Sequence, residues 1–321
     1  MRVLITGMGG ELGTRVANLL EADEDVSEIL GIDGYPPRRR IARADFHMIE
    51  PTDRRRIVSV VREFDPEVLL HLAAYEPHAH FGPTAARLNT QASAVSTLGA
   101  AATCRSLRRI VLRSGVEVYG RRRGAPMRPD ETAPIDPTNG WGRSLGHVEH
   151  LAYETGGLAG VPVVALRFAP IVGPSFPSPL GRYLRLPVVG VSPLAELPFS
   201  LVHQEDAAVA VVAAAKGSSS GPLNVVGPGA ITASQAVRRG RRIPMPVFGP
   251  GWRFAAVSSE VQGAPLPSHT RELLVRGAGA DGSRAHEVLG IDPRSTSDVV
   301  DQLFRWSDVQ EVTPPVRAGR R

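Results

Sequence analysis

Val3-Leu4-Ile5-Thr6-Gly7-Met8-Gly9-Gly10-Glu11-Leu12-Gly13 decides the fold of this 321-residue chain. The branched residues at its start predict a buried parallel strand, and the glycines after Thr6 predict a tight turn. Apolar residues then recur at helical spacing, so a helix is expected over residues 11–20. The stretch therefore predicts a strand, a glycine turn and a helix in direct succession.

Three glycines of this stretch, Gly7, Gly10 and Gly13, follow one another at intervals of three residues. The first permits the turn, the second lets the backbone approach a pyrophosphate, and the third lets helix and strand pack closely. Because glycine turns also occur with a purely structural role, the residues that follow must decide between a structural turn and a binding site. Residues 29–32 predict a second strand that ends in Asp33, 20 residues after Gly13. That spacing places a carboxylate at the ribose of an adenosine, which favours a dinucleotide site.

Composition excludes several classes of protein. Hydrophobic residues make up 42% of the chain and charged residues 21%, which is typical of a globular fold. No apolar run reaches the length of a membrane span and the first residues lack the apolar core of a signal peptide, so a cytoplasmic protein is expected. Cys104 is the single cysteine, which excludes an internal disulfide and a thiolate cluster.

The charge of the chain gives a weaker indication of possible partners than its composition gives of its class. The net charge of +5 and several arginine runs are compatible with nucleic acid or an anionic membrane surface. The runs are scattered over different predicted loops and lack interleaved aromatic residues, so solvent-exposed loops are the favoured interpretation and neither partner is expected.

Strands and helices are expected to alternate along the chain. Further strands are predicted over residues 42–46, 67–74, 109–112 and 223–226, and further helices over 53–64, 84–104, 205–215, 232–238 and 295–306. This order predicts an α/β fold, a Rossmann-type doubly wound parallel sheet with ligands at the carboxyl ends of the strands. Asp33 favours NAD, because a carboxylate there repels a 2′-phosphate, whereas the basic run from Arg38 to Arg40 leaves NADP open.

A combination of motifs resembles the extended short-chain dehydrogenase/reductase family, in its NAD-dependent epimerase/dehydratase branch. The motifs are the glycine stretch, Asp33, His71-Leu72-Ala73-Ala74, Val118-Tyr119-Gly120, Leu166-Arg167-Phe168-Ala169-Pro170-Ile171-Val172-Gly173-Pro174, Val202-His203-Gln204-Glu205-Asp206 and Pro222-Leu223-Asn224-Val225-Val226-Gly227. Within the branch, the chain looks like atypical UDP-glucose 4-epimerase-like proteins.

The resemblance implies how the chain is divided into domains. It implies a dinucleotide-binding domain over residues 1–170, to which about 199–216 return, and a smaller substrate-binding domain over 171–312. Two prolines and three arginines separately predict a disordered tail over 313–321. The resemblance also implies a nucleotide sugar as partner and a homodimer formed through helices near residues 84–104 and 141–156. The implied cofactor-binding residues are Gly7, Met8, Gly10, Glu11, Leu12, Gly13, Asp33, Asp45, Phe46, Leu72, Ala73, Ala74 and Asn89.

The catalytic set of the family is not preserved in this sequence. The family uses a Ser or Thr together with a Tyr-x-x-x-Lys pair on one helical face, where the ammonium lowers the tyrosine pKa. The resemblance places Trp141 at the tyrosine position, Leu145 at the lysine position and Gly115 at the serine position. Indole and leucine side chains cannot exchange protons near neutral pH, so the usual acid–base step is lost at these positions.

Other groups could replace them. Glu117, Tyr119 and the neighbouring Ser114 are the best candidates, although a helix cap or an arginine partner is the favoured interpretation of Glu117. His147 is expected at the surface, and histidine pairs such as His78 and His80 lack a third ligand, so no metal is expected. The favoured hypothesis is a cofactor-binding pseudoenzyme or sensor. The alternatives are a nucleotide-sugar epimerase or oxidoreductase with non-standard acid–base residues, and a basic nucleic-acid or membrane-surface binding protein.

Overall fold

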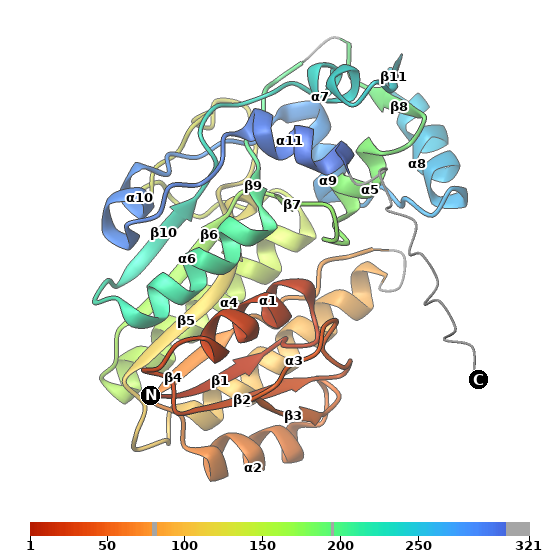
Figure 1. Ribbon diagram of the computed structural model, residues 1–321. Helices are drawn as coiled ribbons and strands as arrows, with labels where there is room; N and C mark the ends of the chain where they lie inside the picture. Colours follow the sequence, from red (N-terminus) through yellow and green to blue (C-terminus); the bar gives the residue numbers. More distant parts are fainter. Residues whose placement is uncertain (79–81, 194–195, 306–321) are drawn as a thin grey trace, which may run out of the picture.

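A seven-stranded parallel sheet forms the centre of the protein (Figure 1). The structure, a computed structural model, describes residues 1–78, 82–193 and 196–305. The sheet contains β1 (Arg2–Thr6), β2 (Glu28–Asp33), β3 (Asp45–Met48), β4 (Val68–His71), β5 (Arg109–Gly115), β6 (Val163–Phe168) and β10 (Gly221–Val225) in the order β10-β6-β5-β4-β1-β2-β3. The strand order reverses beside β1, whose neighbours are β2 and β4. The predicted doubly wound fold is confirmed, and the reversal marks the edge where such sheets bind ligands.

Helices cover both faces of the sheet. On one face α1 (Glu11–Glu21) packs beside α6 (Gln204–Lys216), and on the other α2 (Arg54–Phe64), α3 (Pro83–Ala101) and α4 (Gly140–Ala159) lie side by side. Val3 and Ile5 of β1 belong to the apolar cluster on the face covered by α1 and α6, and Leu4 belongs to the cluster on the opposite face. Burial on both faces explains why the strand is apolar at successive residues. A homodimer through α3 and α4 stays a prediction.

A second group of elements lies beyond the carboxyl ends of the strands, at the top of Figure 1. It contains η1 (Val116–Tyr119), β7 (Ile171–Val172), α5 (Pro179–Leu184), β8 (Val188–Val191), β9 (Val202–His203), α7 (Ala233–Arg239), β11 (Ile243–Pro246), α8 (Gly251–Val261), α9 (Ser268–Arg276) and α11 (Thr296–Arg305). Its interior is a separate apolar cluster that includes Tyr183, Phe199 and Leu303. The remaining helix, α10 (Ser283–Leu289), packs beside β10 and α6. The predicted cap of α7 is present, because Thr232 and Gln235 form a reciprocal capping box.

Several boundaries differ from the sequence-based expectations. β3 begins at Asp45, close to where the predicted strand ends, and α8, α9 and α10 were not predicted. β10 pairs with β6, so residues 221–225 extend the large sheet although the predicted second domain included them. The division at residue 170 otherwise stays a prediction, and Trp306 and the predicted tail over 313–321 lie outside the described residues.

Membrane insertion of a helix finds no support in the part of the chain that the structure describes. None of its helices there combines the length and the apolar character that crossing a bilayer requires.

A buried histidine in the sheet predicts a pH-dependent stability. Nδ1 of His71 lies 2.8 Å from Oγ1 of Thr6, and burial lowers the pKa of His71 from 6.5 to about 4. The unfolded chain therefore binds more protons than the folded chain as the pH falls from about 6.5 to about 4. We expect the free energy of unfolding to fall over this window by an amount on the order of 3 kcal/mol.

Urea unfolding at the two ends of the window measures this change. His71→Gln should flatten the pH dependence, whereas His147→Gln, at an exposed position of α4, should preserve it. A wild-type stability that is constant across the window would refute the assignment of a neutral His71.

Candidate functional site

The glycine loop brings three backbone segments into contact. Gly7 has φ +76°, and a Cβ added there would lie 2.7 Å from the backbone nitrogen of Ala73. A Cβ added to Gly13 would lie 2.2 Å from the carbonyl oxygen of Gly7. Gly10 precedes α1 without a side-chain cap, which leaves N–H groups of the first helical turn available. The loop is thus a backbone cradle that suits a pyrophosphate.

Asp33 lies beside this cradle at the end of β2. Its Oδ2 accepts a hydrogen bond of 3.0 Å from the backbone N–H of Gly9, and its Oδ1 accepts one of 3.3 Å from the Tyr75 hydroxyl. Burial raises the pKa of Asp33, against the effect of backbone N–H groups at Gly34 and Tyr35 and of the Tyr75 and Gly9 contacts. The sheet and the loop therefore hold the carboxylate in one orientation toward the cavity.

A cavity of about 140 Å³ follows the cradle from α1 to the end of β4. Nine of the predicted cofactor-binding residues line it, and they are Gly7, Gly10, Glu11, Leu12, Gly13, Asp33, Leu72, Ala73 and Ala74. The lining also includes Arg38, Tyr75, Glu76, His78 and Arg113. The local motifs therefore converge on one cavity, as expected at the switch point of a doubly wound sheet.

Four of the predicted cofactor-binding residues lie outside the lining of this cavity. Met8 is fully buried, and its Sδ fills the space above Gly31. Asp45 pairs with Leu30 at the start of β3 and lines a different cavity, while Phe46 packs on the apolar cluster beside α1. Asn89 is half-buried on α3. The predicted third strand ended at Phe46, which placed Asp45 and Phe46 at the ligand edge of the sheet. The observed β3 begins at Asp45, so this expected position was wrong and both residues lie at the opposite end of the strand.

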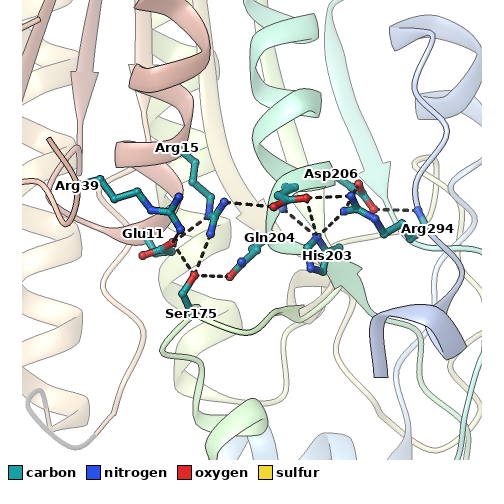
Figure 2. A network of polar contacts seen from close by, with 9 residues as sticks. Glu11, Arg15, Arg39, Ser175, His203, Gln204, Asp206 and Arg294 are labelled. Atoms are coloured by element: carbon teal, nitrogen blue, oxygen red, sulfur yellow. Dashed lines mark hydrogen bonds and ion pairs between the residues drawn. The ribbon is translucent and has the colours of Figure 1, made fainter. Parts of the chain in front are cut away.

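Glu11 directs its side chain into a polar network between α1 and α6 (Figure 2). Its Oε1 accepts hydrogen bonds from Nε of Arg15 at 2.9 Å and from the Ser175 hydroxyl at 3.0 Å. Ser175 also lies 3.3 Å from Oε1 of Gln204, which begins α6. Arg294 then bonds Asp206 in the next part of the network. The carboxylate of Glu11 is therefore paired with arginines of the protein itself.

A second cavity adjoins the first at the ends of β5 and β6. Glu117, Trp141 and Leu145 line it, and Glu76 and Arg113 line both cavities. Trp141 and Leu145, on successive turns of α4, are buried to 7% and 1% exposure. A dinucleotide in the cradle would therefore extend toward Glu117, Trp141 and Leu145.

An unpredicted cluster of charged side chains surrounds Trp141. Nε2 of His269, on α9, lies 2.9 Å from Oε1 of Glu76, and the guanidinium of Arg113 lies 3.8 Å from the other oxygen of Glu76. Burial alone would raise the pKa of Glu76, but the hydrogen bond from His269 and the charges of His269 and Arg113 lower it. The ring centroids of His269 and Trp141 are 6.0 Å apart. The cluster joins α9 to the end of β4 across the cavity.

The other two predicted catalytic residues are bound in a buried network. Ser114 donates a hydrogen bond to Glu149, which forms a bidentate ion pair with Arg167, including an N–O distance of 2.7 Å. Arg167 also donates to the Tyr119 hydroxyl at 2.9 Å, and that hydroxyl donates to Asn224 at 2.7 Å. Burial raises the pKa of Tyr119 despite the nearby Arg167. The two hydroxyls therefore stabilise the packing between β5, α4 and β10. Of the three predicted catalytic residues, Ser114 and Glu117 line the second cavity and Tyr119 does not.

Metal ligation gains no support from the histidines. The described ranges contain no group of three or more His, Cys, Asp or Glu side chains that could hold a metal ion. His147 is exposed as predicted, and His150 lies 3.2 Å from Glu154 on the same helix. His78 lines the dinucleotide cavity, and His80 lies outside the described residues.

Known proteins share both this sequence pattern and this fold. A model of the NAD dependent epimerase/dehydratase family matches residues 3–188. A 3-diazoavenalumate denitrifying reductase from Streptomyces is 31% identical over 244 residues, which cover 70% of this chain and 75% of that protein. A protein of Mycobacterium tuberculosis is 28% identical over an alignment of 329 positions, which covers 98% of this chain and 86% of that protein.

Solved structures with low sequence identity show the same fold. UDP-glucose 4-epimerase from Thermotoga maritima, solved with UDP-glucose, superposes with a TM-score of 0.74 at 17% identity, covering 96% of this chain and 98% of that one. WbmG from Bordetella bronchiseptica, solved with NAD, gives a TM-score of 0.73 at 19% identity, covering 96% and 94%. The glycine cradle, the strand order and the match over more than half of the sequence agree, and the chain belongs to the NAD dependent epimerase/dehydratase family.

Proposed function

We propose that this protein is a NAD-dependent reductase that transfers hydride without the Tyr–Lys pair of its family. The observation that carries this proposal is that the two cavities adjoin, with Glu76 and Arg113 in the lining of both. The cradle at Gly7–Gly13 would hold the pyrophosphate, Asp33 the adenosine ribose, and the end of β4 the nicotinamide half. Bound NADH would supply a hydride, and an acceptor would have to enter beside Glu76 and Arg113, because the second cavity measures only about 30 Å³.

The chemistry of one relative supports a reaction of this kind. The 3-diazoavenalumate denitrifying reductase is 31% identical to this chain. Reductive loss of N₂ from an aryl diazonium ion needs one hydride and no proton, because the carbon that loses nitrogen gains the hydrogen with its electron pair. An enzyme for such an acceptor does not need the phenol and ammonium that Trp141 and Leu145 replace.

The buried Trp141 and Leu145 also favour a second candidate, a cofactor-binding pseudoenzyme or sensor. A third candidate, supported by neighbours solved with UDP-sugars, is a nucleotide-sugar epimerase with other acid–base residues. We infer NAD rather than NADP from Asp33, although Arg38 lines the same cavity.

A titration followed by a reduction assay separates these candidates. We expect heat of binding with NADH in calorimetry, followed by oxidation of NADH when 4-carboxybenzenediazonium is added, at a rate above that without protein. NADH binding without oxidation of any added acceptor would favour the pseudoenzyme. Interconversion of UDP-glucose and UDP-galactose would favour the epimerase, and absence of NADH binding would contradict all three.

A further inference from the structure

Helix α8 lies at the outside of the second group of elements (Figure 1). Its side chains Phe254, Val257 and Val261 are 79%, 62% and 84% exposed. Because these residues follow one another at intervals of three and four, they share one face of the helix. Trp252 and Ser259, on the opposite face, are buried and hold α8 on the protein. The helix therefore keeps an apolar face directed into solvent.

The two-stranded sheet beside α8 extends this apolar surface. A Cβ added to Gly190 of β8 would lie 3.5 Å from Cβ of Ala255, so α8 covers that face of the sheet. Gly190 pairs with Met245, and two residues earlier Val188 pairs with Ile243. Side chains two residues apart on a strand point to the same face, and all three are exposed. We call the following six side chains the α8 patch: Val188, Ile243, Met245, Phe254, Val257 and Val261.

Basic side chains flank the α8 patch. Arg238 lies in the last turn of α7, Arg241 lies two residues before β11, and Arg253 lies next to Phe254 on α8. All three are exposed, and within the part of the chain that the structure describes their guanidinium groups form no hydrogen bond or ion pair. Glu260 is the acidic residue of α8. The sequence-based interpretation of the arginines as solvent-exposed loops did not anticipate that the fold places some of them beside an apolar surface.

A contiguous apolar surface of this kind marks an interaction site, and its charge indicates the partner. In a two-fold contact between copies of the chain, the α8 patch would meet itself and the flanking arginines would face one another. Like charges would then oppose the contact. Phosphate groups complement the arginines, and the boundary between lipid headgroups and acyl chains accommodates phenylalanine and valine.

We propose that the α8 patch binds the surface of a bilayer that contains anionic phospholipids. With 11 residues, α8 is too short to cross the bilayer and lies in the headgroup region with its apolar face toward the acyl chains. Arg238, Arg241 and Arg253 bind lipid phosphates beside it. This attachment involves neither the glycine cradle nor the second cavity, so it does not depend on the proposed reductase function.

Vesicle flotation measures this binding. We expect the protein to float with vesicles of phosphatidylcholine and phosphatidylglycerol and to bind vesicles of phosphatidylcholine alone much more weakly. Binding should also weaken between about 0.1 M and about 1 M salt, because the Debye length falls from about 10 Å to about 3 Å. Equal binding to the two kinds of vesicle overturns the role of the arginines, and absence of binding to either overturns the proposal.

Matched variants assign the binding to the α8 patch. Phe254→Ser should weaken binding to the anionic vesicles at least about tenfold, because an aromatic side chain no longer enters the bilayer. Met48→Ser, which removes an exposed apolar side chain from β3 at the edge of the large sheet, should leave binding unchanged. Equal binding by wild type and Phe254→Ser would contradict a role of α8, provided that circular dichroism shows both proteins folded.

Two triple variants separate the local arginines from the net charge. Arg238→Gln/Arg241→Gln/Arg253→Gln should weaken binding at least about tenfold. Arg54→Gln/Arg55→Gln/Arg56→Gln removes the same charge from exposed positions of α2 and should stay within about twofold of the wild type. An equal loss in both variants would show that net charge alone attracts the protein, and the proposed surface would be wrong.

A gain of signal provides a second readout. The fluorescence of Phe254→Trp should be quenched by brominated acyl chains in anionic vesicles more strongly than that of the wild type, because the new indole lies in the bilayer. Equal quenching of the two proteins overturns the proposed orientation. A dimer in analytical ultracentrifugation that Phe254→Ser abolishes, together with absence of vesicle binding, would assign the α8 patch to a second copy of the chain.

Discussion

Arg167→Met is expected to lower the free energy of unfolding by about 3–5 kcal/mol. The substitution leaves the carboxylate of Glu149 buried and without its partner, since the two side chains are 4% and 1% exposed. It also removes the hydrogen bond from Arg167 to the Tyr119 hydroxyl. Burial alone would lower the pKa of Arg167, but Glu149 and Tyr119 hold it above its usual range, so the guanidinium is charged. Urea denaturation measures the loss.

Two controls assign this loss to the unpaired charge. The double variant Glu149→Leu/Arg167→Met should recover most of the stability, because apolar replacement of a buried pair is close to neutral. Arg239→Gln breaks a pair of half-exposed side chains with Asp301 and should cost less than about 1 kcal/mol. Equal stability of wild type and Arg167→Met would show that the network does not stabilise the fold.

Gly13→Ala is expected to weaken NADH binding by at least about a hundredfold, or about 2.7 kcal/mol. The added Cβ would lie 2.2 Å from the carbonyl oxygen of Gly7 and 2.6 Å from Cα of Met8. Both neighbours are backbone atoms that cannot rotate away, so α1 must move relative to the cradle. Calorimetric titration with NADH measures the change.

A second helical glycine provides the matched control. Gly157 lies on α4 with no heavy atom within 4 Å of an added Cβ. Gly157→Ala should therefore retain NADH binding and stabilise the protein by up to about 1 kcal/mol, the difference in helix propensity. Wild-type affinity in Gly13→Ala would place the dinucleotide elsewhere, provided that circular dichroism shows a folded protein.

The sequence predicts those parts of the fold that local signals determine. β1, the glycine turn and α1 were predicted within one or two residues, because strand burial, turn chemistry and helical periodicity act on neighbouring residues. β3 was misplaced because it is an edge strand of four residues whose side chains are mostly exposed, so burial leaves little signal in its sequence. α8 and α9 were missed because each begins after a proline within a region of proline and glycine that reads as loop.

The same distinction between local and long-range determinants applies to the candidate site. Glu117 was found because it follows a predicted strand, and the structure keeps it at the cavity. Ser114 and Tyr119 met the same criterion, but distant partners bind them, and Asn224 is 105 residues from Tyr119. His269 and Glu76 are 193 residues apart, so no local pattern joins them before the chain folds. Sequence patterns thus located the edge of the sheet, and tertiary contacts decided which side chains remain available there.

Stereospecific hydride transfer tests the central claim most directly. The protein is mixed with 4-carboxybenzenediazonium and NADH that carries deuterium at either the pro-R or the pro-S position of nicotinamide C4, and the benzoate formed is analysed by mass spectrometry. We expect deuterium in the benzoate from one of the two NADH isomers only, and loss of this selectivity in Gly13→Ala. Equal labelling from both isomers, as in free solution, or no benzoate above the uncatalysed amount would contradict hydride transfer at this site.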